Sequence, residues 1–301
     1  MTATFAVNRP GRSWIPVIET LRPGDVPRLR LPNPRVAAAM RRSLERYPDR
    51  SVWSPETLEY AILAPWRHRP EIAHVDEIYA VRHVEPLLQA AFERCADRGD
   101  DLMLVLDFES DLLPSRYERA GLHLLEEVVT YELVLSYGTR ETSGSLHEER
   151  VFPGDVDAVA ELLRIDRTSF PWLWQNNRIE FETYLMTPGV TVSLVTRNAD
   201  PIGYYGVTHF PGWSHLDRIA VLPSLQGLGV GSQVLSLALQ SARHSGSRRI
   251  GLSTQQTNHR SQRLYERFGF RRTPDLDYRL FGAWCRGDRT AVDRTGDTRI
   301  K

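Results

Sequence analysis

A glycine-containing segment in the C-terminal half has residue types and spacing suited to binding a phosphate-bearing ligand. Residues 219–232 read Ile-Ala-Val-Leu-Pro-Ser-Leu-Gln-Gly-Leu-Gly-Val-Gly-Ser and run from an expected strand into an expected helix. Glycine at 227, 229 and 231 would let backbone N–H groups approach an anion closely, because no Cβ is in the way and positive φ is tolerated. The helix N-terminus adds about half a positive charge. A pyrophosphate is the natural ligand of such a loop.

The spacing of these glycines excludes two other phosphate-binding motifs. A dinucleotide fingerprint, Gly-x-Gly-x-x-Gly, fails at its third glycine. The strand expected after the helix ends in Ser-Thr-Gln-Gln at 253–256, without the acidic residue that would hold a ribose. A P-loop is excluded because no Gly-Lys-Ser or Gly-Lys-Thr follows. The loop therefore belongs to another class of anion-binding motif.

A second segment follows the loop and completes a recognisable pattern. Residues 258–270 read Asn-His-Arg-Ser-Gln-Arg-Leu-Tyr-Glu-Arg-Phe-Gly-Phe. Together with Gln226, Gly229 and Gly231, this segment resembles the GCN5-related N-acetyltransferase (GNAT) family over roughly residues 146–285. The resemblance implies an α/β fold with a mixed central sheet flanked by helices. It also implies that acetyl-CoA (coenzyme A) is the cosubstrate.

The resemblance assigns the cofactor to the loop and to the strand before it. Backbone N–H groups of the loop would hold the pyrophosphate, and the strand 219–221 would pair with the pantetheine arm, leaving its side chains in the core. Asn258 would orient the cofactor or, alternatively, only cap a helix. The expected cofactor-binding residues are Ile219, Ala220, Val221, Gln226, Gly227, Leu228, Gly229, Val230, Gly231, Ser232, Asn258 and Ser261.

Tyr265 is at the position where the family places a general acid that protonates the leaving thiolate. A phenol with an ordinary pKa of about 10 can donate to a thiolate whose conjugate acid has a pKa of about 8.5. The alternative is a buried tyrosine that only packs against coenzyme A.

An amine acceptor is protonated at neutral pH and has to lose a proton before it attacks. His215 and Asp217 are two residues apart on an expected strand, so their side chains project from one face. With an ordinary pKa of about 6.5, His215 is the better base, and Asp217 could orient it or attract the ammonium group. The alternative is a solvent-facing pair without a catalytic role, and His209 is a weaker candidate.

Aromatic residues cluster in the segment that covers the acceptor side of the cleft in this family. Their faces could bind an amine through cation–π contacts worth about 0.5–2 kcal/mol. The alternative is a core position, in which they pack the two halves of the chain together. The expected substrate-binding residues are Phe170, Trp172, Trp174, Tyr204 and Trp213.

Hydrophobic periodicity predicts the elements that position these residues. In the C-terminal half we expect helices that begin at 154, 229 and 258, and strands over 149–152, 190–196, 202–210, 214–221, 249–253 and 278–283. In the N-terminal half we expect helices over 36–47, from 86 and over 114–120, and strands over 51–66, 76–83, 102–106 and 128–136.

The length of 301 residues suits two domains, and the chain repeats itself weakly. Residues 74–78 (His-Val-Asp-Glu-Ile) resemble 215–219 (His-Leu-Asp-Arg-Ile), and residues 117–122 resemble 265–270. The first copy is shorter where the second carries its glycine loop. We therefore predict a degenerate GNAT-like domain over 1–145 and a catalytic GNAT domain over 146–285. A linker over 138–147 would join them, and a disordered tail would occupy 286–301.

Bulk composition argues against several classes of protein. Lys and Arg number 38 and Asp and Glu also number 38, so no basic excess indicates nucleic-acid binding. Cys95 and Cys285 are far apart in sequence, and neither they nor the nine histidines show metal-ligand spacing. No apolar run has the length of a membrane span or a signal peptide. We expect no metal, no membrane association and a cytoplasmic location.

The leading hypothesis is an N-acetyltransferase that moves an acetyl group from acetyl-CoA to the primary amine of a small molecule by direct attack. One alternative is an enzyme that acetylates a protein N-terminus, as ribosomal-protein acetyltransferases do. Another is a non-catalytic module that binds acyl-CoA for regulation. The tandem halves could act as an internal dimer, so the protein is expected to be a monomer or a homodimer.

Overall fold

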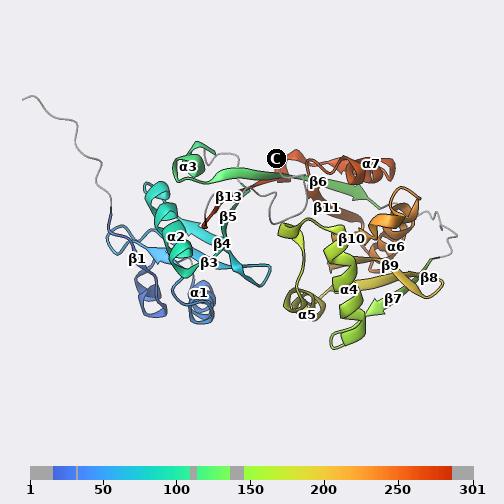
Figure 1. Ribbon diagram of the computed structural model, residues 1–301, viewed down its shortest axis with the longest axis horizontal. Helices are drawn as coiled ribbons and strands as arrows, with labels where there is room; N and C mark the ends of the chain where they lie inside the picture. The colour runs from blue at the N-terminus through green and yellow to red at the C-terminus, as the bar shows by residue number, and fades with distance from the viewer. Residues whose placement is uncertain (1–15, 32, 109–113, 136–145, 287–301) are drawn as a thin grey trace, which may run out of the picture.

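The computed structural model describes residues 16–31, 33–108, 114–135 and 146–286, which form two helix-covered lobes on one continuous sheet (Figure 1). The first lobe contains β1 (Glu19–Thr20), η1 (Pro23–Arg28), α1 (Pro34–Arg46), β2 (Val52–Trp53), β3 (Tyr60–Trp66), β4 (Arg69–Tyr79), α2 (Val84–Arg98), β5 (Leu102–Asp107) and α3 (Pro114–Arg119). The long β6 (His123–Val134) then leads across to the second lobe.

The second lobe begins with β7 (His147–Val151), α4 (Val156–Ser169), η2 (Trp172–Trp174), α5 (Arg178–Met186), β8 (Val190–Arg197), β9 (Asp200–Phe210) and β10 (Trp213–Val221). It continues with η3 (Pro223–Leu225), α6 (Val230–His244), β11 (Arg249–Gln255), α7 (His259–Arg267), β12 (Arg271–Arg272), η4 (Pro274–Leu276) and β13 (Tyr278–Trp284). The sheet is mixed, because β4–β5 and β10–β11 are parallel and the other pairs are antiparallel. The predicted α/β fold with a mixed central sheet is confirmed.

Helices cover both faces of the second lobe's sheet. Tyr204 and Ala220 pack in one hydrophobic cluster with α4 and α5, whereas the adjacent Tyr205 and Val221 pack in another with α6. Since successive strand side chains point to opposite faces, α4 and α5 lie on one face and α6 on the other. The cleft described below is lined both by the α4–α5 connection on one face and by the start of α6 on the other.

Two predicted strands differ from the observed ones, and one observed helix was not predicted. The apolar run expected as one strand over 51–66 is divided by a turn into β2 and β3. The strand expected over 76–83 is shifted, because β4 already begins at Arg69 and α2 takes over at Val84. Helix α5 was missed, although Asn177 caps it by accepting a hydrogen bond from the Glu180 amide at 2.8 Å. Asn is a favoured N-cap residue, so that signal was present in the sequence.

The last strand of each half pairs with the other half. Strand β6 lies between β13 and β11, and β13 lies between β5 and β6. Figure 1 shows β6 and β13 running between the two lobes. The proposed domains, residues 1–145 and 146–285, are consecutive in the chain. In the structure one sheet joins them, because β6 of the first part and β13 of the second each pair with strands of the other part.

The two repeated segments occupy corresponding strands and share an irregularity. Residues 215–219 lie on β10, where the register with β9 shifts so that Asp217 is an extra residue. Residues 74–78 lie on β4, where the register with β3 shifts so that Asp76 is the extra residue. A β-bulge at matching positions of the two segments is what an internal duplication would produce.

The two cysteines, distant in sequence, lie together in the structure. A hydrogen bond with Cys285 and burial both raise the pKa of the Cys95 thiol. Cys95 is on α2 and Cys285 directly follows β13, and both are free thiols. The strand exchange brings them together, and sequence spacing gave no sign of it.

Two sequence expectations fall on residues that the structure does not describe. The expected linker over 138–147 lies largely within residues 136–145, and the expected tail lies almost wholly within 287–301. In the described part of the chain, none of the helices combines the length and the apolar character needed to cross a membrane.

Candidate active site

A cleft of about 1620 Å³ opens on the second lobe and is lined by residues of both halves. Its walls come from the α4–α5 connection, β10, β11, the start of α6 and α7, together with side chains of β6 and the β3–β4 turn. Pockets for one small ligand are typically about 300–1,000 Å³, so this volume suits two substrates at once.

The cleft follows a divergence between two parallel strands. Strands β10 and β11 pair only over 213–216 and 249–252. Beyond this point β10 is paired with β9 and β11 with β6, so the facing edge of β10 has no strand partner among the described residues. The bulge at Asp217 occurs where the pairing ends. An exposed strand edge of this kind can pair with an extended ligand through main-chain hydrogen bonds.

The predicted glycine loop connects β10 to α6 at the open end of this divergence. Gly227 and Gly229 have φ of 85° and 81°, a conformation that favours glycine, and no side chain caps α6. The side chain of Gln226 fixes the loop: its Nε2 donates to the Val221 carbonyl at 2.9 Å, and its Oε1 accepts from Arg260 Nη1 at 2.7 Å. The uncapped amides of the first turn are therefore available to an anion.

The structure brings ten of the twelve predicted cofactor-binding residues to the lining of the cleft. Leu228 does not line it, because its side chain is 69% exposed. Val230, the first residue of α6, does not line it either, since its side chain is buried in the core. For both residues the prediction concerned the backbone amide.

Tyr265 lies in the cleft with its side chain 5% exposed. Its ring packs beside those of Tyr131 and Phe270, at centroid distances of 6.2 and 5.8 Å. Burial raises the pKa of Tyr265 to about 12, against a smaller opposite effect of a hydrogen bond with Ser261. The phenol therefore stays protonated over the whole working pH range, as a proton donor must.

His215 and Asp217 also line the cleft, and they contact each other. His215 Nδ1 lies 2.8 Å from Asp217 Oδ1. The second carboxylate oxygen accepts hydrogen bonds from Tyr184 at 2.5 Å and Thr208 at 2.6 Å. The expected shared face is confirmed, and the pair is tied to α5 through Tyr184, which is not among the expected site residues.

Phe170, Trp172 and Trp174 line the acceptor side of the cleft. The β3–β4 turn of the first lobe holds this segment, because Trp66 Nε1 donates to the Leu173 carbonyl at 2.8 Å and Arg69 Nη1 to the Trp172 carbonyl at 2.6 Å. Both interpretations of these aromatics, pocket lining and packing between the halves, therefore describe part of their surroundings.

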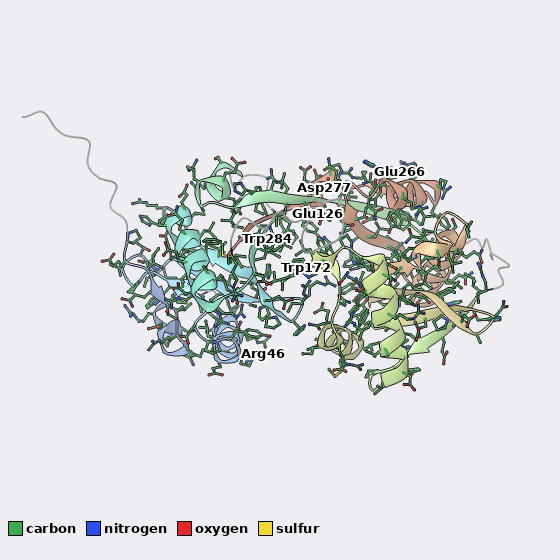
Figure 2. All side chains as sticks on the ribbon, viewed as in Figure 1. Arg46, Glu126, Trp172, Glu266, Asp277 and Trp284 are labelled. Carbon is green, nitrogen blue, oxygen red and sulfur yellow. The ribbon has the colours of Figure 1, made fainter. Side chains whose placement is uncertain are left out.

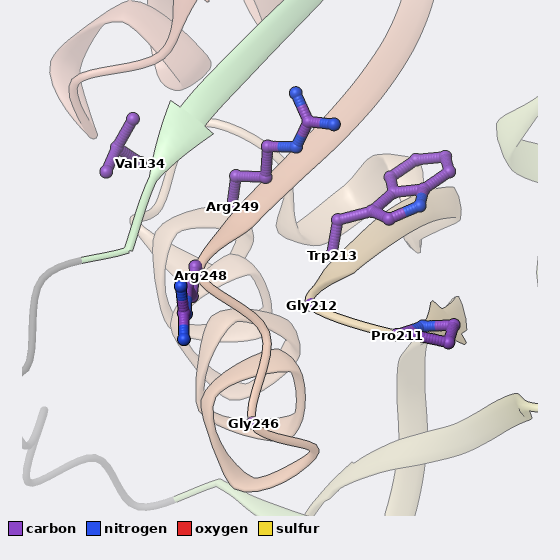
Figure 3. Close-up of a pocket in the computed structure, with 7 residues that line it drawn as sticks. All are labelled: Val134, Pro211, Gly212, Trp213, Gly246, Arg248 and Arg249. Carbon is purple, nitrogen blue, oxygen red and sulfur yellow. The ribbon is translucent and has the colours of Figure 1, made fainter.

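Tyr204 and Trp213 were expected beside them, and the structure places both elsewhere. Tyr204 is fully buried on the α4 side of the sheet, where its hydroxyl donates to Asp166. Trp213 lies at the opposite end of β10, stacked on Phe210 at 4.5 Å, and lines a separate pocket of about 620 Å³ (Figure 3). The prediction of these two as substrate-binding residues is wrong, because strand alternation buries the first and strand length separates the second from the cleft.

A buried ion pair fixes the acceptor-side segment from below. Asp166 of α4 is 0% exposed and pairs with Arg218 of β10. Arg218 also donates to the Trp174 carbonyl at 3.0 Å, and its guanidinium lies 3.8 Å above the Phe170 ring. Asp166 accepts in addition from the Asn176 amide at 2.8 Å. These partners are up to 52 residues apart, so no local pattern indicated them.

Two charged residues of the first lobe reach into the cleft, and both were missed. Arg67, in the β3–β4 turn, donates to Asn176 Oδ1, and burial is the main cause that lowers its pKa to about 10. Glu126, on β6, accepts a hydrogen bond from Trp174 Nε1. Figure 2 shows Glu126 and Trp172 at the junction of the lobes. The exchange of β6 between the lobes brings Glu126 to the site.

The counterpart of the glycine loop in the first lobe holds an internal anion. The connection between β4 and α2 is only four residues long, 80–83. The buried Glu59 carboxylate accepts from the amides of Val81 at 2.7 Å and Arg82 at 2.8 Å, and lies 2.6 Å from His83 Nδ1. Burial by itself would raise the pKa of Glu59, but these hydrogen bonds lower it overall.

Among the residues that the structure describes, no group of three or more His, Cys, Asp or Glu side chains is arranged to hold a metal ion.

Comparison with solved structures supports the fold over almost the whole chain. A GCN5-related N-acetyltransferase from Sphaerobacter thermophilus superposes with a TM-score of 0.61 at 16% identity, covering 91% of this chain and 98% of that one. A tandem GNAT protein from the clavulanic acid biosynthesis pathway gives 0.59 at 15% identity, covering 91% and 99%.

Two sequence relatives match about a third of the chain. An aminoalkylphosphonate N-acetyltransferase of Salmonella typhimurium is 29% identical over 106 residues, which is 33% of this chain and 69% of the relative. A putative [ribosomal protein bS18]-alanine N-acetyltransferase of Bacillus subtilis is 26% identical over 115 residues, or 38% and 74%. Residues 157–270 match the family model for acetyltransferases of the GNAT family. Residues 157–270 therefore form an acetyltransferase domain of the GNAT family, and the protein is an acyltransferase enzyme.

Proposed function

We propose that the protein transfers an acetyl group from acetyl-CoA to the primary amine of a small molecule by direct attack. The observation that carries this proposal is that one continuous cleft contains both sides of the expected site. It joins the uncapped, glycine-lined end of α6 and the buried Tyr265 to an acceptor side that holds aromatic and charged side chains. An acyl donor and an amine could therefore be bound side by side in this cleft.

The residues present fit acetyl-CoA. The first turn of α6 offers unpaired amides to the pyrophosphate, and the glycines leave space there, since nothing lies within 4 Å of a Cβ built on Gly229. The free edge of β10 over 217–221 offers main-chain groups to the pantetheine arm. An N–H there would donate to the thioester oxygen and stabilise the tetrahedral oxyanion, a contribution of about 3 kcal/mol in other enzymes.

Tyr265 would protonate the coenzyme A thiolate as the tetrahedral intermediate collapses. The acceptor ammonium must first lose a proton, and His215, held by Asp217, is the base that the sequence-based interpretation proposes. No covalent enzyme intermediate is required, because the amine attacks the thioester carbon directly. Asn258 caps α7 through the Ser261 amide, which keeps Tyr265 in place.

Two acceptor classes are compatible with the relatives. One relative is named for an aminoalkylphosphonate and the other for the N-terminal alanine of a ribosomal protein. Trp172 and Trp174 narrow the acceptor side and favour a small amine. A protein N-terminus and a non-catalytic acyl-CoA-binding role are the alternatives. A cytoplasmic location and a monomeric or homodimeric state stay proposals.

Turnover distinguishes these alternatives. The full chain is incubated with acetyl-CoA and with small primary amines, an aminoalkylphosphonate among them, or with an alanine-initiated peptide. Release of the free thiol is measured. We expect turnover with small amines and little with the peptide. The reverse would establish the protein substrate, and binding of acetyl-CoA without turnover of either would overturn the transferase proposal.

A negative charge at the start of α6 is expected to weaken acetyl-CoA binding. Ser232→Glu would place a carboxylate where the pyrophosphate is proposed to lie, and repulsion should raise Kd by about 10-fold or more, or about 1.4 kcal/mol. Ser232→Gln has a similar size without the charge and serves as the control. Calorimetric titration gives both constants. Equal affinities of the two variants would remove the pyrophosphate from this position.

We expect one acetyl-CoA per chain, because Glu59 already occupies the anion position of the first lobe. Calorimetry should give a stoichiometry of one. Glu59→Gln should lower the free energy of unfolding by about 1–3 kcal/mol, since the amides of Val81 and Arg82 lose a charged acceptor. Two equivalents bound per parent chain would contradict this interpretation of the first lobe.

A further inference from the structure

Glu126 is a largely buried carboxylate in the cleft without a cation beside it. Among the described residues, the neutral indole of Trp174 donates a hydrogen bond to it. In the described parts of the chain, no arginine, lysine or histidine forms an ion pair with it, and no charged group contributes to its titration. A charge that is removed from water is costly unless it is paired. A ligand with a positive charge would supply the missing partner.

Three of the cations that line the same cleft are already engaged. Arg67 is bonded to Asn176 and lies 3.8 Å from Glu180, while Arg218 pairs with Asp166. His215 lies against Asp217. None of the three can neutralise Glu126 without breaking its own contacts. A cation from outside the protein would pair with Glu126 without breaking these contacts.

The position of Glu126 along the sheet suits the acceptor. Val128 pairs with Gln255, the last residue of β11, and Glu126 follows two residues farther along β6 on the same face. This point lies beyond the end of β11, on the side of the cleft where Trp174 stands. The neighbouring Glu127 is exposed and belongs to the other face of the strand.

We propose that Glu126 receives the ammonium group of the acceptor and takes up the proton that it loses before acetyl transfer. This inference rests on the proposed transferase function and assigns to Glu126 the role that His215 has in the sequence-based interpretation. A primary ammonium group has three donors, and the carboxylate has free acceptor sites beside its bond to Trp174. The first lobe is thereby part of the active site.

The proton balance of this step closes. The ammonium gives one proton to the Glu126 carboxylate, which passes it to solvent, and the free amine forms the N–C bond while the C–S bond breaks. The departing thiolate takes the hydroxyl proton of Tyr265. The amine loses its second proton as the amide forms, and this proton restores the Tyr265 hydroxyl. The products are the amide, the thiol of coenzyme A and one proton released to solvent.

Binding of a cation and of its neutral analogue tests the ammonium site without any turnover. The probes are phenethylammonium and 2-phenylethanol, titrated calorimetrically into the full chain at pH 8. Glu126→Gln should raise Kd for phenethylammonium by about 10-fold or more, or about 1.4 kcal/mol. It should leave 2-phenylethanol unchanged, and Glu127→Gln should change neither constant. Absent binding of the cation, or equal affinity in parent and Glu126→Gln, would overturn the proposal.

The pH dependence identifies the group that titrates. Burial raises the pKa of Glu126 to about 7, so the carboxylate is neutralised as pH falls from 8 to 6 and affinity for phenethylammonium should fall with it. Trp174 and Tyr278 of β13 are the neighbours of Glu126, and Arg67 also acts on Tyr278 electrostatically. Burial raises the pKa of Tyr278 to about 12. Tyr278 and Arg67 do not titrate in this window.

Two variants separate the two candidate bases. The dependence between pH 6 and 8 should disappear in Glu126→Gln and persist in His215→Asn, and kcat/KM with phenethylamine should follow the same pattern. The opposite result would return the proton to His215. If the cation binds as expected but no amine is acetylated, the transferase proposal fails while the ammonium site stands.

Discussion

Tyr265→Phe is expected to lower kcat by about 10²–10⁴-fold, the range for loss of a general acid. The change removes one oxygen and leaves the ring between Tyr131 and Phe270. Because the departing thiolate then has no donor, only the step in which the C–S bond breaks should suffer. Acetyl-CoA should bind with a Kd within about 3-fold of the parent value, which is under 1 kcal/mol.

Steady-state thiol release and calorimetric binding measure the two quantities separately. The raised pKa of Tyr265, about 12, adds a second expectation: its deprotonation should produce no alkaline decline of kcat below about pH 11. A Tyr265→Phe variant with parental kcat would show that the side chain only packs against the cofactor. A large rise of Kd with unchanged kcat would lead to the same conclusion.

Asp166→Ala is expected to lower the free energy of unfolding by about 3–5 kcal/mol, the loss typical when one member of a buried ion pair is removed. Arg218 would remain buried without its counter-ion, and the Tyr204 hydroxyl and the Asn176 amide would lose their acceptor. The segment that carries Trp174 would lose its support as well, so activity should fall even where the protein is still folded.

Urea unfolding with the parent and Asp166→Ala measures this loss. Glu182→Ala is the matched control, since Glu182 forms an exposed pair with Arg178 at 3.8 Å and should cost less than about 1 kcal/mol. The double variant Asp166→Leu with Arg218→Met removes both charges and should be more stable than Asp166→Ala. A loss below 1 kcal/mol in Asp166→Ala would contradict the structural role of the pair.

Local sequence patterns were enough for the elements that surround the cofactor loop. The apolar spacing of α6, the glycines at 227 and 229 and the cap at Asn258 act within a few residues, so their signals are visible in the sequence. The pairing of His215 with Asp217 follows in the same way from strand alternation. The family resemblance extended these signals to Tyr265.

The errors and omissions share one physical cause. Tyr204 lies on β9 but is buried on the α4 face of the sheet. Trp213 lies on β10 but at the end far from the cleft, so neither residue lines it. Residue type does not specify which aromatic side chain faces a ligand and which faces the core. The nearness of Cys95 and Cys285 likewise depends on where β13 pairs.

The sequence by itself determined the α/β fold class and the glycine loop before α6, because periodicity and turn chemistry act between residues close together in the chain. The family resemblance added the proposed role of Tyr265. The tertiary structure decided the composition of the acceptor side. Arg67 and Glu126 reach it from the first lobe, and Asp166 pairs with Arg218 across 52 residues. Glu126 reaches the site through the exchange of β6 and β13, and strand pairing over more than a hundred residues leaves no periodic mark in the sequence.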